Sequence, residues 1–247
     1  IPDANISDPA GSNAFPVSTI KAAPPVAPLG EAAAGIGSLI NPLDVDGVLR
    51  REPLVVRYYD QYFPSLALMT AAKSLNLSVD DIKITRGEAV RLGNLEITTS
   101  RESLMNTFFY DSQDAKDPLR AFPTYSFYNV IQGETPLENF KGKIVLIGAT
   151  AFGVGSTLVT PLGEARGPVM ILAHTVASIL NQDFFVQPDW GFWLELSAIL
   201  LVAAYLTLAL PKLNAGPAAI ATIESASARR GREASGRART EASEGPT

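Results

Sequence analysis

The sequence predicts an α/β fold, with a mostly parallel sheet, helices and an added hairpin, followed by a transmembrane helix. Three observations lead to this prediction. Short apolar runs that are typical of strands recur along the chain. They are separated by longer runs in which apolar residues have helical spacing, an order that α/β domains show. Near the end, an apolar run of about 19 residues is long enough to cross a bilayer.

The first expected elements lie between residues 53 and 98. Pro53–Tyr58 is rich in β-branched and aromatic residues and predicts a strand. Pro64–Leu75 has apolar residues at helical spacing and proline in its first turn, so it predicts a helix. Ala89–Thr98 turns at Gly93-Asn94, a pair typical of tight turns. This last segment is the expected hairpin.

Two more elements are expected before the apolar run. In Lys143–Ile147, with the sequence KIVLI, a lysine is followed by a continuous apolar run, and this pattern predicts a fully buried strand. Met170–Leu180 has its large aliphatic residues on one side and predicts a helix. The alternation of strands and helices favours a parallel sheet.

The most apolar part of the chain is Phe192–Leu210, in which Glu195 is the one charged residue. At about 1.5 Å per residue, a helix of this length spans roughly 28 Å, close to the hydrocarbon thickness of a bilayer. Trp190 and Trp193 stand at its leading end, where indole rings prefer the membrane interface. We expect a transmembrane helix, and a buried core helix is the alternative. Lys212 favours a cytoplasmic C-terminal side.

Changes in composition divide the chain into four expected parts. The opening is rich in proline, and the final residues contain almost no large apolar side chain, so the end should be largely disordered. The expected parts are an irregular remnant of a domain's first part (1–28), a folded α/β domain (29–190), the transmembrane helix (192–210) and the tail (211–247).

The composition also argues against several kinds of site. The chain has no cysteine, so it can form neither a disulfide nor a thiolate metal site. Its net charge of −5 argues against binding to nucleic acid. His174, the single histidine, falls with Ser178 and Asn181 on the polar side of its helix. We therefore expect no metal and no cofactor, and a capping, surface or hydrogen-bonding histidine rather than a catalytic base.

A glycine-rich turn follows the KIVLI run. Gly148 and Gly153 have the spacing of the two glycines of a phosphate-binding loop. Val154 stands where that loop needs a lysine, and Gly155 where it needs a hydroxyl. The turn is therefore expected to be structural, and a nucleotide-binding enzyme is the alternative.

A second motif hints at a calcium loop. Asp44, Asp46 and Gly47 have the required spacing, but prolines occupy the first and the last ligand positions, Pro42 and Pro53. Asp46-Gly47 therefore predicts a tight turn.

The order of the motifs resembles one known family. DVDGVLRREPLVVRY, FPSLAL, FKGKIVLIGATA, TPLG and AHTVASILN, followed by QPDW and the apolar run, are similar to the second class of CHASE domains. These are extracytoplasmic sensory modules of bacterial cyclases and histidine kinases. The resemblance covers about residues 35–210. It implies that 29–190 is a periplasmic sensory domain, anchored in the inner membrane by 192–210, with a cytoplasmic tail.

The resemblance also implies partners and an activity class. It implies a small-molecule or periplasmic signal, a homodimer in the full-length receptor, and an adenylate or guanylate cyclase or a kinase as the output domain. It implies no catalytic site in the sensory module itself. Two alternatives are a nucleotide-binding α/β enzyme and a membrane-tethered periplasmic scaffold.

The expected ligand site lies in the glycine-rich turn. Ligands of open α/β sheets bind at the loops that follow the strand ends. Thr150 and Ser156, after the expected KIVLI strand, are therefore the candidate ligand-binding residues. Relatives commonly have Asp at the position of Ser156.

Overall fold

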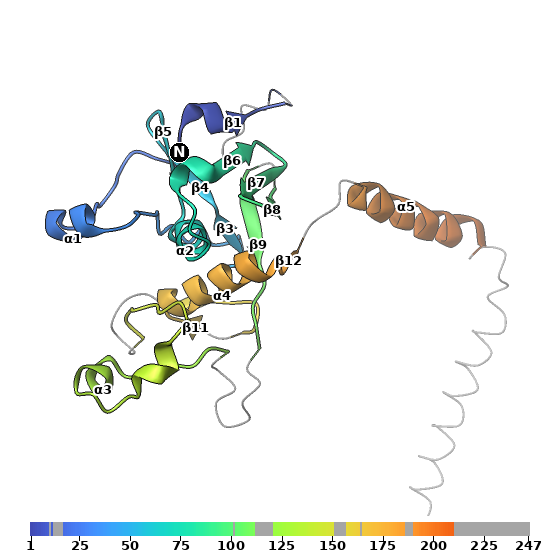
Figure 1. Ribbon diagram of the computed structural model, residues 1–247. Helices are drawn as coiled ribbons and strands as arrows, with labels where there is room; N and C mark the ends of the chain where they lie inside the picture. Colours follow the sequence, from blue (N-terminus) through green and yellow to red (C-terminus); the bar gives the residue numbers. More distant parts are fainter. Residues whose placement is uncertain are drawn as a thin grey trace, which may run out of the picture. The chain divides into compact units, whose positions relative to one another are not determined.

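The computed structural model describes residues 1–9, 11, 17–100, 102–111, 121–150, 157–163, 165–185 and 190–209. The chain forms two compact units, Ile1–Gln187 and Pro188–Thr247. The first unit is a mixed α/β domain, as predicted, in which short strands and two longer helices enclose one main core (Figure 1).

The first unit contains many strands of two to four residues. Their bounds are β1 (Ile6–Ser7), β2 (Val17–Thr19), β3 (Arg51–Pro53), β4 (Val55–Tyr58), β5 (Gln61–Pro64), β6 (Ile82–Thr85), β7 (Ala89–Leu92), β8 (Leu95–Thr98), β9 (Leu104–Thr107), β10 (Leu158–Val159), β11 (Ala165–Arg166) and β12 (Phe184–Phe185). In the described residues they form four small sheets, with the orders β1-β6-β7-β8, β2-β4-β5, β12-β9-β3 and β10-β11.

The prediction of a mostly parallel sheet is wrong. Among the described strands, β1 pairs with β6 and β2 with β4 in parallel, and the other pairings are antiparallel. The short connections explain the difference. Tyr59-Asp60 joins β4 to β5 and Gly93-Asn94 joins β7 to β8, whereas a parallel crossover needs a dozen or more residues. The predicted hairpin is confirmed, with Leu92 opposite Leu95.

The helices of the first unit include two long enough to organise the core. The bounds are η1 (Asp3–Asn5), α1 (Ala27–Ala32), α2 (Leu66–Ser74), η2 (Val79–Asp81), α3 (Phe127–Ile131), η3 (Leu137–Phe140) and α4 (Pro168–Asn181). The helices predicted at 64–75 and 170–180 are confirmed as α2 and α4, although α2 starts later because Pro64 ends β5. Ser65 caps α2, and its buried Oγ accepts a hydrogen bond of 3.1 Å from the Leu68 N–H.

The main core lies where α2 and α4 meet each other and the sheets. The two helices lie side by side (Figure 1). The buried residues of this core are Leu54, Val55, Ala67, Leu68, Ala71, Ala72, Ile82, Ile84, Val90, Leu92, Ile97, Met105, Val176 and Ile179. A smaller buried cluster joins Leu49, Phe109 and Ile171.

The start of the chain contributes to these sheets. Residues 1–28 contain η1, β1, β2 and the beginning of α1, and β1 and β2 both pair in parallel with later strands. The predicted division of the chain at residue 28 stays a prediction.

The KIVLI segment is not the buried strand that its apolar sequence predicts. Ile144, Val145 and Ile147 are 43%, 52% and 75% exposed, and residues 144–150 take no regular secondary structure. An apolar run becomes a buried strand only where neighbouring strands pair with it. Here the segment passes beside α4 instead, so close that a Cβ at Gly148 would lie 2.6 Å from the Cβ of Val169.

The second unit consists, in its described residues, of α5 (Gly191–Ala204) and a π-helical turn (Tyr205–Ala209). These replace the single helix expected at 192–210. No helix in the described part of the chain is both long enough and apolar enough to cross a membrane. Residues of α5 are exposed or half-buried on every side. The predicted disordered tail lies outside the described residues.

Candidate functional site

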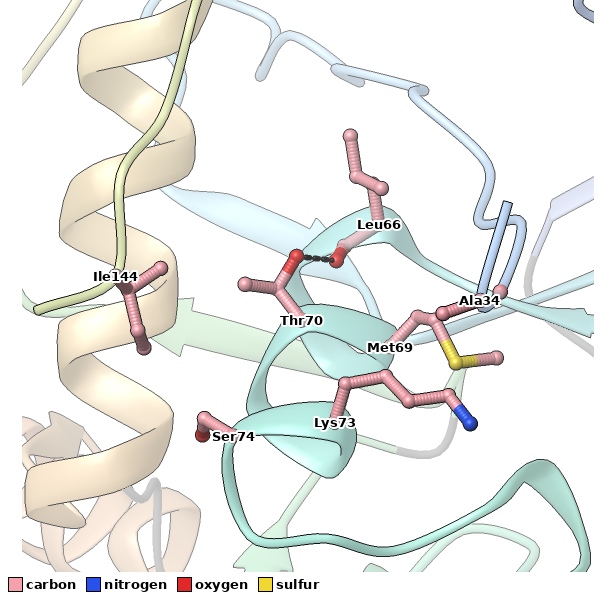
Figure 2. A pocket seen from close by; sticks show the side chains of 8 residues that line it. Ala34, Leu66, Met69, Thr70, Lys73, Ser74 and Ile144 are labelled. Carbon is pink, nitrogen blue, oxygen red and sulfur yellow. Dashed lines mark hydrogen bonds between the residues drawn. The ribbon is translucent and has the colours of Figure 1, made fainter. Parts of the chain in front are cut away.

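A shallow hollow of about 320 Å³ lies beside α2. We call it the α2 hollow. Figure 2 shows the side chains around it. It is lined by Ala34, Gly35, Leu66, Met69, Thr70, Lys73, Ser74 and Ile144. The lining therefore combines one face of α2 with two segments that are distant in sequence, the loop after α1 and the exposed KIVLI segment.

Two glycines let the loop after α1 approach α2. A Cβ at Gly37 would lie only 2.4 Å from the Cα of Leu66, and one at Gly35 would lie 2.8 Å from the Sδ of Met69. Ser38 holds this approach, because its N–H donates to the Pro64 carbonyl (2.9 Å) and its carbonyl accepts from the Leu66 N–H (2.8 Å). A side chain at Gly37 would meet backbone and push the loop away, whereas one at Gly35 would meet the flexible side chain of Met69.

The polar side chains of the α2 hollow differ in whether they already form hydrogen bonds or ion pairs within the protein. The Thr70 hydroxyl donates to the Leu66 carbonyl (2.7 Å), and the Ser74 hydroxyl donates to the Ala71 carbonyl (2.8 Å). Lys73 is the one charged lining residue, and it forms no ion pair with any described residue. In Figure 2 its side chain extends past Met69 toward the side where Ala34 lies. The hollow is thus apolar, with one available cation at its edge.

A second hollow of about 480 Å³ has a charged lining that is already neutralised. Arg50 donates to Asp44 (3.0 Å) and to both carboxylate oxygens of Asp46 (2.9 and 2.6 Å), and Arg51 also pairs with Asp44. Hydrogen bonds from Arg50 and from the Val48 N–H lower the pKa of Asp46 to about 2. Because two arginines balance two aspartates, the described lining of this hollow has no net charge left for a ligand.

The segment that contains Asp44, Asp46 and Gly47, which has the spacing of a calcium loop in sequence, forms a tight turn in the structure. The tight turn predicted at Asp46-Gly47 is confirmed, since Gly47 has a φ of 79° and its N–H donates to the Asp44 carbonyl (2.8 Å). Asp44 and Asp46 form ion pairs with Arg50 and Arg51. In the described residues no three His, Asp or Glu side chains are grouped so that they could hold a metal ion.

His174 is fully buried, and of the capping, surface and hydrogen-bonding roles expected as alternatives the structure confirms the hydrogen-bonding role. Its ring lies among Phe109, Tyr110 and Phe122, with centroids 5.4, 6.1 and 5.0 Å away. Burial, with a further contribution from the charge of Arg166, lowers the pKa of His174 to about 4. The side of α4 that is polar in sequence therefore packs against other segments of the domain at this position. Because the pKa of His174 is low, the ring is neutral at neutral pH.

Glu52 on β3 is a second buried ionisable group. Its residue is 5% exposed, and it lies opposite the buried Met105 of β9. Burial raises the pKa of Glu52 to about 8. No ion pair with a described residue compensates its charge, so the carboxyl is largely protonated at neutral pH.

Of the residues predicted to bind a ligand, Thr150 is described, and it is not among the residues that line either hollow. Thr150 is exposed and lies beside the start of α4, where a Cβ at Gly167 would be 3.8 Å from the Thr150 Cα. Ser156 lies outside the described residues. Their role in ligand binding stays a prediction. Lys73 was missed because a lysine near the end of an amphipathic helix has no distinguishing sequence signal.

The structure describes a small α/β domain with two shallow hollows and no catalytic constellation in the described residues. The model of the CHASE2 domain family matches residues 5–209. This chain therefore belongs to the CHASE2 domain family, whose members are sensory rather than catalytic domains and are typically extracellular parts of membrane receptors. No curated protein and no solved structure matches it. The resemblance inferred from the order of the motifs is thus confirmed.

Proposed function

We propose that this chain is the extracytoplasmic signal-sensing domain of a bacterial transmembrane receptor, coupled to a cyclase or kinase output domain. The observation that supports this most is its membership of the CHASE2 family over residues 5–209. The chemistry of the α2 hollow agrees with sensing. Among the described residues that line it, Lys73 is the one ionisable group, whereas acid–base catalysis needs positioned groups that can give and take a proton.

The apolar stretch 192–210 anchors the sensory domain in the inner membrane in this proposal. The large side chains of α5 support it, because Phe192, Trp193, Leu200 and Leu201 are all well exposed. Each such side chain costs about 1.5–3 kcal/mol when it stays in water instead of an apolar environment. A helix with this composition on every side is therefore more stable in lipid than in water.

Thiol labelling in intact cells tests the location. The chain has no cysteine, so single substitutions give an unambiguous signal. Ser126 is exposed and its side chain makes no capping hydrogen bond to α3, which makes Ser126→Cys a mild change. We expect a membrane-impermeant maleimide to label Ser126→Cys, and to label Ser235→Cys in the tail only after the cells are lysed. Labelling of Ser235→Cys alone in intact cells would reverse the orientation and refute the proposal.

The output and the assembly of the receptor have tests of their own. The genomic DNA downstream of this sequence should encode a cyclase or kinase domain, and a domain of another class would contradict the coupling. A scaffold that only holds partner proteins would need no such domain.

The full receptor should be a homodimer, so light scattering in detergent that gives one chain per particle would contradict this part of the proposal.

A further inference from the structure

The α2 hollow combines two features that together point to a ligand class. Its walls are apolar, with Leu66, Met69 and Ile144 on different sides (Figure 2). Its edge carries the ammonium group of Lys73, while Thr70 and Ser74 use their hydroxyl protons within α2. A molecule that fits both features has an apolar body and one negative charge.

The charge of Lys73 is available to such a molecule. The pKa of Asp81 lies below its usual value. The largest cause is the hydrogen bond from the Ser78 N–H, and the charge of Lys73 makes a smaller contribution. The same oxygen of Asp81 accepts from the Ser78 N–H (2.7 Å) and the Ser78 hydroxyl (2.8 Å). Asp81 is thus held in the cap of η2, and no carboxylate of the described residues lies within ion-pair distance of Lys73.

We propose that the α2 hollow binds a small monocarboxylate with an apolar tail, and that Lys73 pairs with its carboxylate. This inference deepens the proposed sensing function and rests on it. The volume of about 320 Å³ sets how much of a ligand can lie inside the hollow. One liquid water occupies about 30 Å³, so roughly ten non-hydrogen atoms fit, and the hollow is at the small end of ligand pockets. Octanoate has this size and serves as the probe.

The methionines provide a site-specific readout. The chain has three, of which Met69 lines the hollow, Met105 is fully buried in the core and Met170 lies on α4. In the full chain labelled with ¹³C at the methionine methyl groups, octanoate should shift the Met69 signal in a saturable way and leave Met105 unmoved. Shifts of all three signals together, or no shift of Met69, would overturn the proposal.

Matched ligands and variants test the role of the charge. Octan-1-ol and octylamine have the same tail as octanoate, and both should bind more weakly than octanoate. Lys73→Gln should weaken octanoate binding about tenfold, the effect of losing one charge-assisted hydrogen bond. Lys83→Gln, at an exposed lysine on β6, is the control and should leave binding unchanged. Lys73→Glu should reverse the preference, so that octylamine shifts Met69 and octanoate does not.

The outcomes separate this inference from the proposed function. If Lys73→Gln and Lys83→Gln bind octanoate equally, the assignment of Lys73 is wrong, whatever thiol labelling shows for Ser126→Cys. If labelling reverses the orientation while octanoate still shifts Met69 through Lys73, the sensing proposal fails and the hollow remains a carboxylate site. Each result therefore counts against one proposal only.

Discussion

The backbone N–H of Tyr110 donates a hydrogen bond of 3.1 Å to Nδ1 of His174, whose side chain is fully buried. Because Nδ1 is the acceptor, the neutral ring carries its proton on Nε2. One turn further along α4, the Ser178 hydroxyl oxygen accepts from the Phe108 N–H at 3.0 Å. Two polar side chains of α4 thus hold the segment that follows β9, about 70 residues away in sequence.

Removing the Ser178 hydroxyl should destabilise the domain. In Ser178→Ala the half-buried Phe108 N–H loses its acceptor, and because an unsatisfied buried donor costs about 1–3 kcal/mol we expect a loss near the lower end of this range. Urea denaturation should show this loss as a lower transition midpoint. Ser74→Ala is the matched control, because the Ser74 hydroxyl bonds only within its own helix and is exposed. Equal midpoints for both variants would contradict the role of Ser178.

The stability of the domain should pass through a maximum between about pH 4.5 and 6.5. The pKa of Glu52 rises on folding from 4.5 to about 8, so above pH 4.5 the unfolded chain ionises this carboxyl and the free energy of unfolding falls as the pH rises to 8. The pKa of His174 falls from 6.5 to about 4, so below pH 6.5 the unfolded chain gains a proton and the free energy of unfolding falls as the pH drops.

Glu52→Gln should remove the alkaline side of this profile. One pKa unit corresponds to about 1.36 kcal/mol, so the wild-type loss between pH 6.5 and pH 8, a range in which the contribution of His174 no longer changes, should amount to about 2 kcal/mol. The variant should lose little over the same range, and Glu96→Gln at an exposed strand position should behave like the wild type. Urea denaturation at several pH values measures this. Parallel profiles for Glu52→Gln and the wild type would show that Glu52 is not the group responsible.

Local patterns in the sequence predicted the turns and helices that depend on residues close together in the chain. The hairpin followed from Gly93-Asn94 between two alternating runs, and the turn followed from Asp46-Gly47. Helices α2 and α4 followed from the spacing of apolar residues. Their polar faces were harder to place, because the sequence does not say which face meets another segment. His174 is an example, because it is buried although Ser178 and Asn181 lie on the same side of its helix.

Features that depend on distant partners could not be predicted from local patterns. The KIVLI run has the composition of a central strand, but a strand also needs pairing partners, and the structure places this run beside α4. The α2 hollow joins residues near 35, 70 and 144, which share no sequence motif. Family membership came from the order of several weak motifs, which together are more specific than any single one.

Gly37 should be essential for the approach of the loop after α1 to α2. In Gly37→Ala the new Cβ would lie 2.4 Å from the Cα of Leu66 and 2.5 Å from its nitrogen, so backbone must move. This breaks the bonds between Ser38 and the start of α2, and we expect a loss of about 1–3 kcal/mol, typical of overpacking. Gly30→Ala within α1 is the control and should change stability by less than ~1 kcal/mol. A thermal melt of each variant decides between them.

The chain should not bind ATP or GTP more tightly than about millimolar, which corresponds to a binding free energy of about −4 kcal/mol. A phosphate-binding loop needs a preceding strand, a lysine for the phosphate charge and a hydroxyl for magnesium. Here residues 144–150 form no strand, and Val154 and Gly155 stand at the lysine and hydroxyl positions. Calorimetry of the full chain with ATP and magnesium measures the affinity, and a known phosphate-binding-loop protein serves as the positive control. Micromolar affinity would favour the nucleotide-binding alternative over the sensory function proposed for this chain.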